Sequence, residues 1–504
     1  MKGSSLWEKI SSQDTNYPTL SKNTEVDVAI IGGGITGITA AAILLQAGKK
    51  VALLEAHRIG GMTTRNSTGN LYIPVQPYYH TIVSNFDLAT AKQVADSRQF
   101  AIDYIEKNVL HYTIDCQFHR RPWYAYTTSE EKQPLLQKEV ETLKQIGVEI
   151  DYTSNIPFDL KFKKAAVVPN QARFNPLQYV QALAKVLAEK GCFIFENTQV
   201  IGIKETDKCH VLTNQAEISA GEVFMATHTP LDINPTHMFT APYRSYVVGA
   251  YLENGHYPEG HLWKLDSPSP ILSTHALKES HPEILLISGN HHKTGQGKDM
   301  KKHFSKLESF LRDHFKVSEI AFHWSAQHFP SADKLPYIGL ANRSTKNIYM
   351  ATGYFADGLT YGTLAGLLVA YLILNKTNPF SATYNANRFT PLSSIAFITK
   401  ENLNVLTQYA KDLPLGIKDN FENLQIGEGK IVEINREKWA VSRDKSSKLQ
   451  AVSAVCTHMK CIVNWNNAEQ TWDCPCHGSR FAPNGEVLEG PATCNLKKKE
   501  LPGK

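Results

Sequence analysis

The segment Val26–Glu55 restricts the fold of this chain more than any other stretch. It reads VDVAIIGGGITGITAAAILLQAGKKVALLE. A short β-branched apolar run precedes the pattern Gly32-x-Gly34-x-x-Gly37, and apolar residues at helical spacing follow it. A second apolar run ends at Glu55. Strand, glycine turn, helix, strand and acid in this order predict a βαβ unit of a Rossmann-type α/β fold.

Each residue of this motif has a physical reason to be there if a dinucleotide binds. Gly32 permits a tight turn, and Gly34 has no side chain to keep a pyrophosphate away from the backbone. Gly37 lets the helix pack closely on the strand, and the free N–H groups of the helix N-terminus attract phosphates. Glu55 can accept hydrogen bonds from ribose hydroxyls and would repel a 2′-phosphate. We therefore predict a dinucleotide site, in preference to a glycine-rich turn without a ligand.

Length and composition restrict the number of domains and the classes of protein to which the chain could belong. A chain of 504 residues exceeds one hydrophobic core, so we expect two to four domains. With 42% hydrophobic residues and a net charge of +5, it is typical of a soluble globular protein, and Lys497–Lys499 indicates a solvated tail, not a nucleic-acid site. The polar N-terminus lacks a secretory signal, and the apolar run Tyr361–Leu374 is too short for a transmembrane segment and predicts a buried helix. We expect a cytoplasmic protein in which Cys116, Cys192, Cys209 and Cys494 are free thiols.

Three further segments decide between NAD and FAD. They are residues 58–70 (RIGGMTTRNSTGN), residues 222–230 (EVFMATHTP) and residues 347–363 (NIYMATGYFADGLTYGT). They resemble parts of the glycine oxidase and D-amino-acid oxidase superfamily of flavoproteins, over roughly residues 25–375. The resemblance implies FAD, with the last turn directing a helix N-terminus toward the flavin N1/O2 locus, where negative charge develops. The cofactor-binding candidates from motif and resemblance are Gly32, Gly34, Gly37, Glu55, Thr63, Thr64, Val200, Gly353, Gly358 and Thr360.

The resemblance also implies the domain plan. We expect an FAD-binding oxidoreductase domain of the α/β (α+β) class over residues 25–380, with a β-rich substrate domain interleaved in it. The nucleotide-binding parts are expected at 25–80, 150–230 and 335–380, and the substrate parts at about 80–150 and 231–335.

Substrate-binding residues are harder to assign. Arg244, in APYRSYVVGAYL, could clamp a carboxylate together with Tyr246; the alternative is an ordinary strand with an exposed arginine and half-buried tyrosines. His323 could line the flavin pocket or serve as hydrogen-bonded scaffold. No motif for covalent flavin attachment is present. Other residues that stay open on the same grounds are Tyr78, Tyr79, His80, Tyr243, Tyr251 and His328.

The C-terminal part differs in composition. Residues 381–424 are predicted to be a linker with a helix at Thr399–Lys411, and short alternating runs from residue 425 onward predict small antiparallel strands. Within them, Cys456-x-His458 and Cys474-x-x-His477 each supply one thiol and one imidazole. A [2Fe–2S] cluster with two thiolates on one iron and two imidazoles on the other matches this symmetry. Zinc is the alternative, but zinc fingers tend to place the cysteine pair and the histidine pair apart.

The patterns C-T-H-x-x-C and C-P-C-H-G-S resemble the Rieske domains of the cytochrome bc type, over about residues 425–504. The resemblance implies that Cys456 and Cys474 bind one iron and that His458 and His477 bind the other. It also implies a disulfide between the two cluster loops and a third loop that covers the cluster. The disulfide pair would be Cys461 and Cys476, with paired free thiols as the alternative in a reducing compartment, and the third loop Gly490-Pro491-Ala492.

Two positions bear on the reduction potential. Ser479 matches a residue whose hydroxyl bonds a bridging sulfide in the Rieske family. Phe481 stands where high-potential members have a tyrosine that donates to a cysteine sulfur. Because a missing donor destabilises the more negative reduced cluster, we expect a potential below the top of the Rieske range of roughly −150 to +300 mV.

These observations predict an oxidoreductase. No second dinucleotide fingerprint follows residue 60, which argues against a reductase that uses both NAD and FAD. We expect the flavin, which itself carries the catalytic role, to oxidise a small amine or amino acid and to pass electrons one at a time through the cluster to an external acceptor. The alternatives are electron flow in the reverse direction and a redox-sensing or electron-transfer protein without its own substrate.

Overall fold

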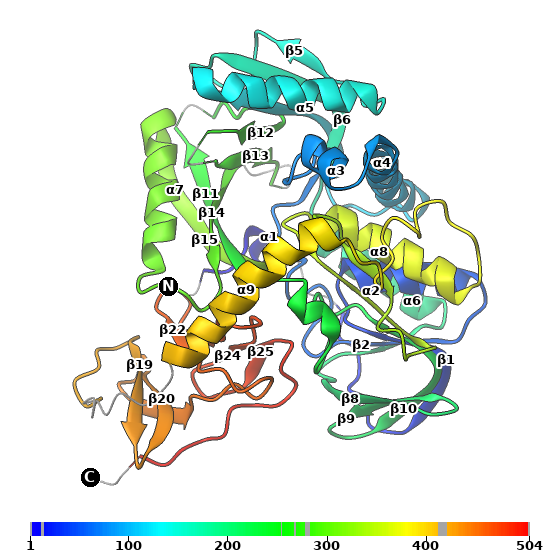
Figure 1. Ribbon diagram of the computed structural model, residues 1–504, viewed down its shortest axis with the longest axis vertical. Coiled ribbons are helices and arrows are strands. Elements are labelled where there is room, and N and C mark those ends of the chain that lie inside the picture. The colour runs from blue at the N-terminus through cyan, green and yellow to red at the C-terminus, as the bar shows by residue number, and fades with distance from the viewer. Residues whose placement is uncertain are drawn as a thin grey trace.

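The computed structural model describes residues 3–11, 15–253, 255–266, 269–277, 283–411 and 421–501. Two large sheets with their helices occupy the first three quarters of the chain, and small β-sheets form the C-terminal part (Figure 1). This C-terminal part, orange and red in Figure 1, lies next to the end of the sheet that contains β11 and β15. We call residues 421–501 the C-terminal module.

The first sheet has eight strands and contains the predicted βαβ unit. Strands β16, β17, β10, β1, β2 and β7 follow one another in this order, and β8 and β9 extend the sheet beside β10. β1 pairs in parallel with both β2 and β10, as a Rossmann-type sheet requires. The strands are β1 (Thr24–Ile31), β2 (Val51–Leu54), β7 (Phe193–Phe195), β8 (Val200–Glu205), β9 (Cys209–Thr213), β10 (Glu217–Met225), β16 (Tyr337–Leu340) and β17 (Ile348–Thr352).

Two buried helices cover this sheet. Helix α2 (Ile35–Gln46) begins at the glycine turn, where a Cβ on Gly37 would lie 2.0 Å from the carbonyl oxygen of Gly32. Helix α8 (Gly358–Ile373) contacts α2 so closely that a Cβ on Gly366 would lie 2.5 Å from the carbonyl oxygen of Thr36. The long apolar run is therefore a buried helix, as predicted. Among the described residues, no helix is long and apolar enough to cross a membrane.

The second sheet has ten strands and is mostly antiparallel. Its order is β18-β15-β11-β14-β13-β12-β4-β6-β3, and β5 pairs with β6. Helix α7 lies against β11, β14 and β15, and α5 covers the far end (Figure 1). The strands are β3 (Asn70–Leu71), β4 (His119–Thr127), β5 (Asp151–Thr153), β6 (Lys164–Arg173), β11 (Tyr243–Leu252), β12 (His261–Lys264), β13 (Ile271–His275), β14 (Ile284–Lys293), β15 (Val317–Pro330) and β18 (Tyr354–Phe355).

The remaining helices connect these layers. The chain passes from α8 through α9 to the C-terminal module, and α9 runs diagonally across the molecule (Figure 1). The helix predicted in the linker is therefore present, and it begins earlier than the pattern indicated. The helices are α1 (Leu6–Ile10), α3 (Tyr79–Asn85), α4 (Leu88–His111), α5 (Gln133–Gln145), α6 (Pro176–Glu189), α7 (Lys301–His314), α9 (Pro391–Lys411) and the 3-10 turns η1 (Glu130–Lys132) and η2 (Pro235–Met238).

The C-terminal module consists of strands, as the alternating runs predicted. A three-stranded sheet, β19-β20-β21, and a four-stranded sheet, β22-β23-β24-β25, share a core that includes Trp472 and Phe481. The cysteines of the cluster motif belong to the same core. The strands are β19 (Gly429–Ile434), β20 (Glu437–Arg443), β21 (Leu449–Ser453), β22 (Asn464–Asn466), β23 (Thr471–Asp473), β24 (Arg480–Phe481) and β25 (Val487–Glu489).

Candidate functional site

One cavity is lined by three parts of the chain that lie far apart in sequence. The glycine turn and the end of β2 form one wall, with Gly32, Gly34 and Glu55. Strands β11, β14 and β15 of the second sheet form another wall. Residues Val487–Gly490 of the C-terminal module complete the lining, together with Ala492 and Thr493.

The nucleotide end of the cavity fits a dinucleotide. The Glu55 carboxylate accepts hydrogen bonds from the N–H groups of Gly33 and His57, each at 2.8 Å. Burial raises the pKa of Glu55, although both hydrogen bonds act in the opposite direction. At the start of α2, Gly34 has no side chain to cap the helix, and Gly34, Ile35 and Thr36 line the cavity. The N–H of Ile35 donates to Thr64 Oγ1 at 3.1 Å, and a Cβ on Gly34 would lie 3.1 Å from the same oxygen, a tight approach.

The N-terminus of α8 opens into the same cavity. Gly358 and Leu359 line it, and a Cβ on Gly358 would meet no atom within 4 Å. Asp357 precedes the helix without capping it and instead lies 3.5 Å from buried Arg98. The positive end of the helix dipole is therefore available to a ligand, which fits a flavin ring edge that carries negative charge when reduced.

Most of the cofactor-binding candidates lie at this cavity. The structure brings together Gly32, Gly34, Glu55, Thr63, Thr64, Val200 and Gly358 in its lining. Gly37 instead packs α2 on the sheet, and Thr360 is buried in α8. Gly353 adopts φ +81°, a turn conformation, and a Cβ there would lie 3.1 Å from Ser331 Cβ. Contact of these residues with FAD stays a prediction, and for the last three only an indirect role fits their positions.

Two of the three substrate candidates point away from the cavity. Side chains alternate between the two faces of a strand, and on β11 Ser245 and Val247 line the cavity. Arg244 and Tyr246 lie on the opposite face, where Tyr246 stacks on His303 with ring centroids 4.8 Å apart. Arg244 is only 1% exposed, so the alternative of an exposed arginine is wrong.

The third candidate, His323, lies at the surface of the second sheet. Its Nε2 is 2.8 Å from Glu308 Oε1 on α7. His328, five residues further along β15, does line the cavity, and burial lowers its pKa well below the usual value. His291 also lines the cavity, with its ring centroid 5.1 Å from that of His328. No local pattern in the sequence points to His291, because its place in the lining depends on how β14 pairs within the sheet.

The other open residues have structural partners. The backbone N–H of Tyr79 donates to Glu139 Oε1 at 2.8 Å, and His80 Nδ1 lies 2.8 Å from Glu139 Oε2. Tyr78 stacks on His80. The hydroxyl of Tyr243 donates to Glu401 on α9 at 3.3 Å. None of these contacts places the residues in the lining of the cavity.

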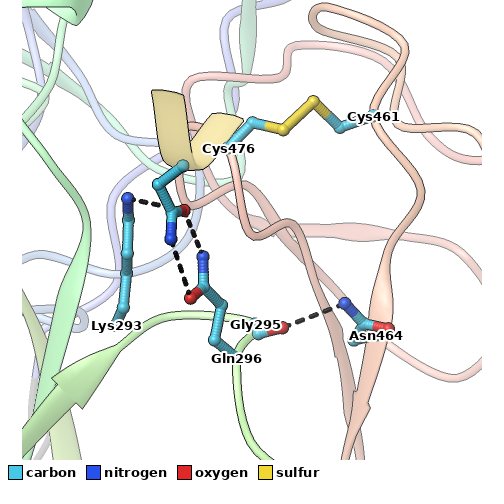
Figure 2. The surroundings of a disulfide bond; sticks show 7 residues. Lys293, Gly295, Gln296, Cys461, Asn464 and Cys476 are labelled. Carbon is cyan, nitrogen blue, oxygen red and sulfur yellow. Dashed lines mark hydrogen bonds between the residues drawn. A yellow bond between two sulfur atoms is a disulfide. The ribbon is translucent and has the colours of Figure 1, made fainter. Parts of the chain in front are cut away.

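The two loops of the cluster motif lie side by side in the C-terminal module. In the first loop, the N–H of Cys456 donates to the carbonyl of Cys461 at 2.8 Å, and in the second that of Cys474 donates to Ser479 at 2.8 Å. A disulfide joins Cys461 to Cys476 (Figure 2), which confirms the predicted pair.

The four predicted iron ligands form two pairs in these loops, one of histidines and one of cysteines. The ring centroids of His458 and His477 are 5.0 Å apart, and Nδ1 of each ring is buried without a hydrogen-bond partner. The thiol of Cys474 donates to Cys456, which lowers the pKa of Cys456 to about 7. Backbone N–H groups of His458 and Met459 also point at the Cys456 sulfur. Two orphaned imidazole nitrogens and two thiols with backbone donors fit a metal centre with mixed ligands.

Residues of the first domain contact the cluster motif, which the sequence did not reveal. His458 Nε2 lies 3.1 Å from the backbone carbonyl oxygen of Asp232. The ring of His237 on η2 lies 5.0 Å from that of His458 and 5.6 Å from that of His477. Because more than two hundred residues separate these positions in sequence, only the tertiary structure brings them together.

Comparison with known proteins agrees with this geometry. Residues 27–372 match the family described as FAD dependent oxidoreductase, and residues 418–500 match the Rieske [2Fe-2S] domain. The Bacillus subtilis protein YhfW, whose name describes it as a Rieske 2Fe-2S iron-sulfur protein, is 35% identical over 98% of this chain and 97% of its own length. Gamma-glutamylputrescine oxidoreductase of Escherichia coli is 22% identical over 76% of this chain and 91% of its own.

Solved structures share the fold of the larger part. Glycine oxidase from Geobacillus kaustophilus superposes with a TM-score of 0.61 at 18% identity, over 73% of this chain and 99% of that one. L-proline dehydrogenase from P. horikoshii gives 0.59 at 20% identity, over 73% and 98%. The cofactors are FAD and a [2Fe–2S] cluster, not zinc. The chain is an oxidoreductase that belongs to the FAD-dependent oxidoreductase family and carries a C-terminal Rieske [2Fe–2S] domain.

Proposed function

We propose that this protein oxidises a small amine or amino acid in the cavity and passes the electrons through the Rieske cluster to an external acceptor. One observation carries the proposal: the cavity that holds the nucleotide motif is also lined by residues 487–490 of the Rieske domain. The two cofactor sites are therefore neighbours within one chain. When bound, a flavin accepts two electrons as a hydride and a Rieske cluster carries one electron at a time.

The cavity wall of the second sheet supplies the substrate site in this proposal. It presents neutral polar groups, including the hydroxyls of Ser245 and Ser288 and the amide of Gln327. The imidazole of His328 is neutral at pH 7, because burial lowers its pKa. Such a wall can orient an amine through hydrogen bonds without a strong charge, so we rank amines before carboxylate-bearing amino acids. Relatives named for glycine, L-proline and gamma-glutamylputrescine support carbon–nitrogen bond oxidation.

Anaerobic stopped-flow absorbance tests this proposal with the holoprotein. We expect one or more small amines to bleach the flavin, followed by the spectral and paramagnetic signature of a reduced Rieske cluster. Variant Cys474→Ser, which removes a predicted iron ligand, should still bleach but show no cluster signal. If no amine or amino acid bleaches the flavin, the substrate class is wrong. If metabolites instead reoxidise chemically reduced protein, electrons flow in the reverse direction.

A further inference from the structure

A buried group of charges joins the two domains. Arg244 extends from β11 into the Rieske domain, where its Nη2 lies 2.7 Å from each carboxylate oxygen of Glu469. Its Nη1 lies 3.9 Å from Glu489 Oε1. On the Rieske side, Arg480 contacts Glu469 at 3.1 Å, Asp473 at 3.0 Å and Glu489 at 2.7 Å. We call these five residues the interdomain charge cluster.

The carboxylates of this cluster obtain their second counterion only from the other domain. The Rieske domain supplies three carboxylates but a single guanidinium, so its own part carries two excess negative charges. Arg244 reduces this excess by one. Burial alone raises the pKa of Glu489, yet its net pKa is lowered because Arg480 and Arg244 outweigh the burial. Withdrawal of Arg244 would leave carboxylates in a poorly solvated place without their second counterion, which is costly.

Hydrogen bonds hold the cluster loops in the same place. Gln327, which lines the cavity, donates from Nε2 to the carbonyl oxygen of Gly478 at 2.9 Å. Gly478 adopts φ +83°, and a Cβ there would lie 2.5 Å from Pro242 Cβ, so glycine permits this close approach. Asn464 donates to the carbonyl oxygen of Gly295 at 2.9 Å, next to the disulfide (Figure 2). The contact of Gln327 with Gly478 connects the second cluster loop directly to the wall of the cavity.

Helix α9 contacts both domains and so links them. Lys293 donates to Asn404 of α9 at 2.9 Å, and Gln296 donates to the same amide oxygen at 2.6 Å (Figure 2). Val405 of the same helix packs against the core of the Rieske domain. The helix therefore touches both the second sheet and the Rieske domain.

We propose that Arg244 is a positioning residue that holds the Rieske domain in a fixed place on the flavin domain, and that the two cofactor sites exchange electrons in this docked arrangement. Each exchange moves one electron from reduced flavin to oxidised cluster, and no bond forms or breaks. The exchange rests on the proposed function, whereas the fixed docking stands on the contacts above. Arg244 thus binds carboxylates, as its sequence context suggested, but those of its own chain.

Two measurements on the full-length holoprotein test this proposal without a substrate. Small-angle X-ray scattering reports whether the domains separate, and photochemical reduction of the flavin followed by cluster absorbance reports the transfer rate. Wild type should scatter as a compact particle and transfer electrons at a rate independent of added glycerol. Arg244→Met should enlarge the particle and slow the transfer by about tenfold or more, because truncation of a buried charge pair weakens an interface strongly. The transfer should then depend on viscosity.

Further variants separate docking from folding. Arg244→Lys keeps the charge and should restore part of the rate, whereas the paramagnetic spectrum of the reduced cluster should not change in either variant. The double variant Arg244→Met with Glu469→Gln has the wild-type net charge but no interdomain pair, so it should fold and still transfer slowly. Arg120→Met, which breaks an ion pair with Asp103 and Glu106 far from the interface, is the matched control.

Distinct results would overturn the proposal. Unchanged scattering and transfer in both Arg244→Met and the double variant would show that Arg244 does not hold the domains. A wild-type transfer that slows in proportion to viscosity would show that the Rieske domain moves. Because photoreduction needs no amine, a failed substrate screen would contradict the proposed function and leave this test intact.

Discussion

At the scale of single residues, we expect Phe481 and Ser479 to adjust the reduction potential of the cluster. Phe481 is fully buried in the core that contains Cys456 and Cys474. Ser479 Oγ accepts a hydrogen bond from the N–H of Ala492 at 3.0 Å, and its hydroxyl donates one to the Cys456 sulfur. We predict that Phe481→Tyr raises the midpoint potential by about 60 mV, equal to tenfold for a one-electron couple, because a new donor stabilises the reduced cluster. Ser479→Ala should lower the potential.

A redox titration followed by paramagnetic resonance measures both shifts. The matched control is Phe421→Tyr, in the separate core of the β19–β21 sheet, where the same hydroxyl should leave the potential unchanged. A Phe481→Tyr variant that folds, keeps its cluster and shows no rise would contradict the idea that hydrogen-bond donors set this potential.

Arg244 shows why ligand motifs are easier to predict than partners of single residues. The predicted iron ligands follow from spacing within 24 residues, and in the structure the two histidines lie close to each other, as do the two cysteines. The partner of Arg244, in contrast, lies 225 residues further along the chain. Its orientation depends on the strand register of β11, because a shift of one residue would exchange Arg244 with Ser245. No local pattern contains this information.

At the scale of elements, the disulfide fixes the two cluster loops to each other. Cys461 and Cys476 are 15 residues apart, and a loop of this length gives about 3 kcal/mol of stabilisation in the chain-entropy account. We predict that Cys461→Ser lowers the free energy of unfolding of the Rieske domain by about this amount. Loss of cluster absorbance on heating measures it. The exposed free cysteine Cys494 provides the control Cys494→Ser, and equal melting of both variants would refute the prediction.

Most secondary-structure elements could be predicted from the sequence, whereas the lining of the cavity could be predicted only in part. The βαβ unit and the buried helix α8 follow from local periodicity and glycine placement, and the structure confirms both. The third wall of the cavity comes from β25 and the loop after it, and the only role predicted there was that the loop Gly490-Pro491-Ala492 covers the cluster. That contact arises from domain docking, which depends on surfaces distant in sequence.

At the scale of the whole molecule, buried histidines make the fold sensitive to acid. His261 on β12 is fully buried, its Nε2 lies 3.0 Å from the carbonyl oxygen of Ala172, and burial lowers its pKa to about 3. The unfolded chain therefore takes up a proton near pH 6.5, before the folded chain does. Stability should be complete above pH 6.5 and fall toward pH 3, by on the order of a few kcal/mol from this residue.

Urea unfolding at pH 7.5 and 5.5 tests this dependence. We predict that His261→Gln, although less stable than wild type at pH 7.5, loses less stability between the two values, because one titrating group is gone. His314→Gln, at an exposed position on α7, is the control. An equal acid loss in wild type and His261→Gln would show that His261 does not contribute to it.

The presence of two cofactors in one chain makes an odd electron count, and this count can be measured. FAD accepts two electrons and a [2Fe–2S] cluster accepts one, so full reduction of the holoprotein should take about 1.5 equivalents of a two-electron reductant per chain. Variant His458→Ala, which lacks a predicted iron ligand, should take about 1.0 equivalent and keep its flavin spectrum. Anaerobic dithionite titration measures the number of equivalents per chain, and iron analysis measures the cluster content of each protein. A value of 1.0 for wild type with full iron content would mean that the cluster lies outside the range this reductant reaches, which contradicts the potential expected from Ser479 and Phe481.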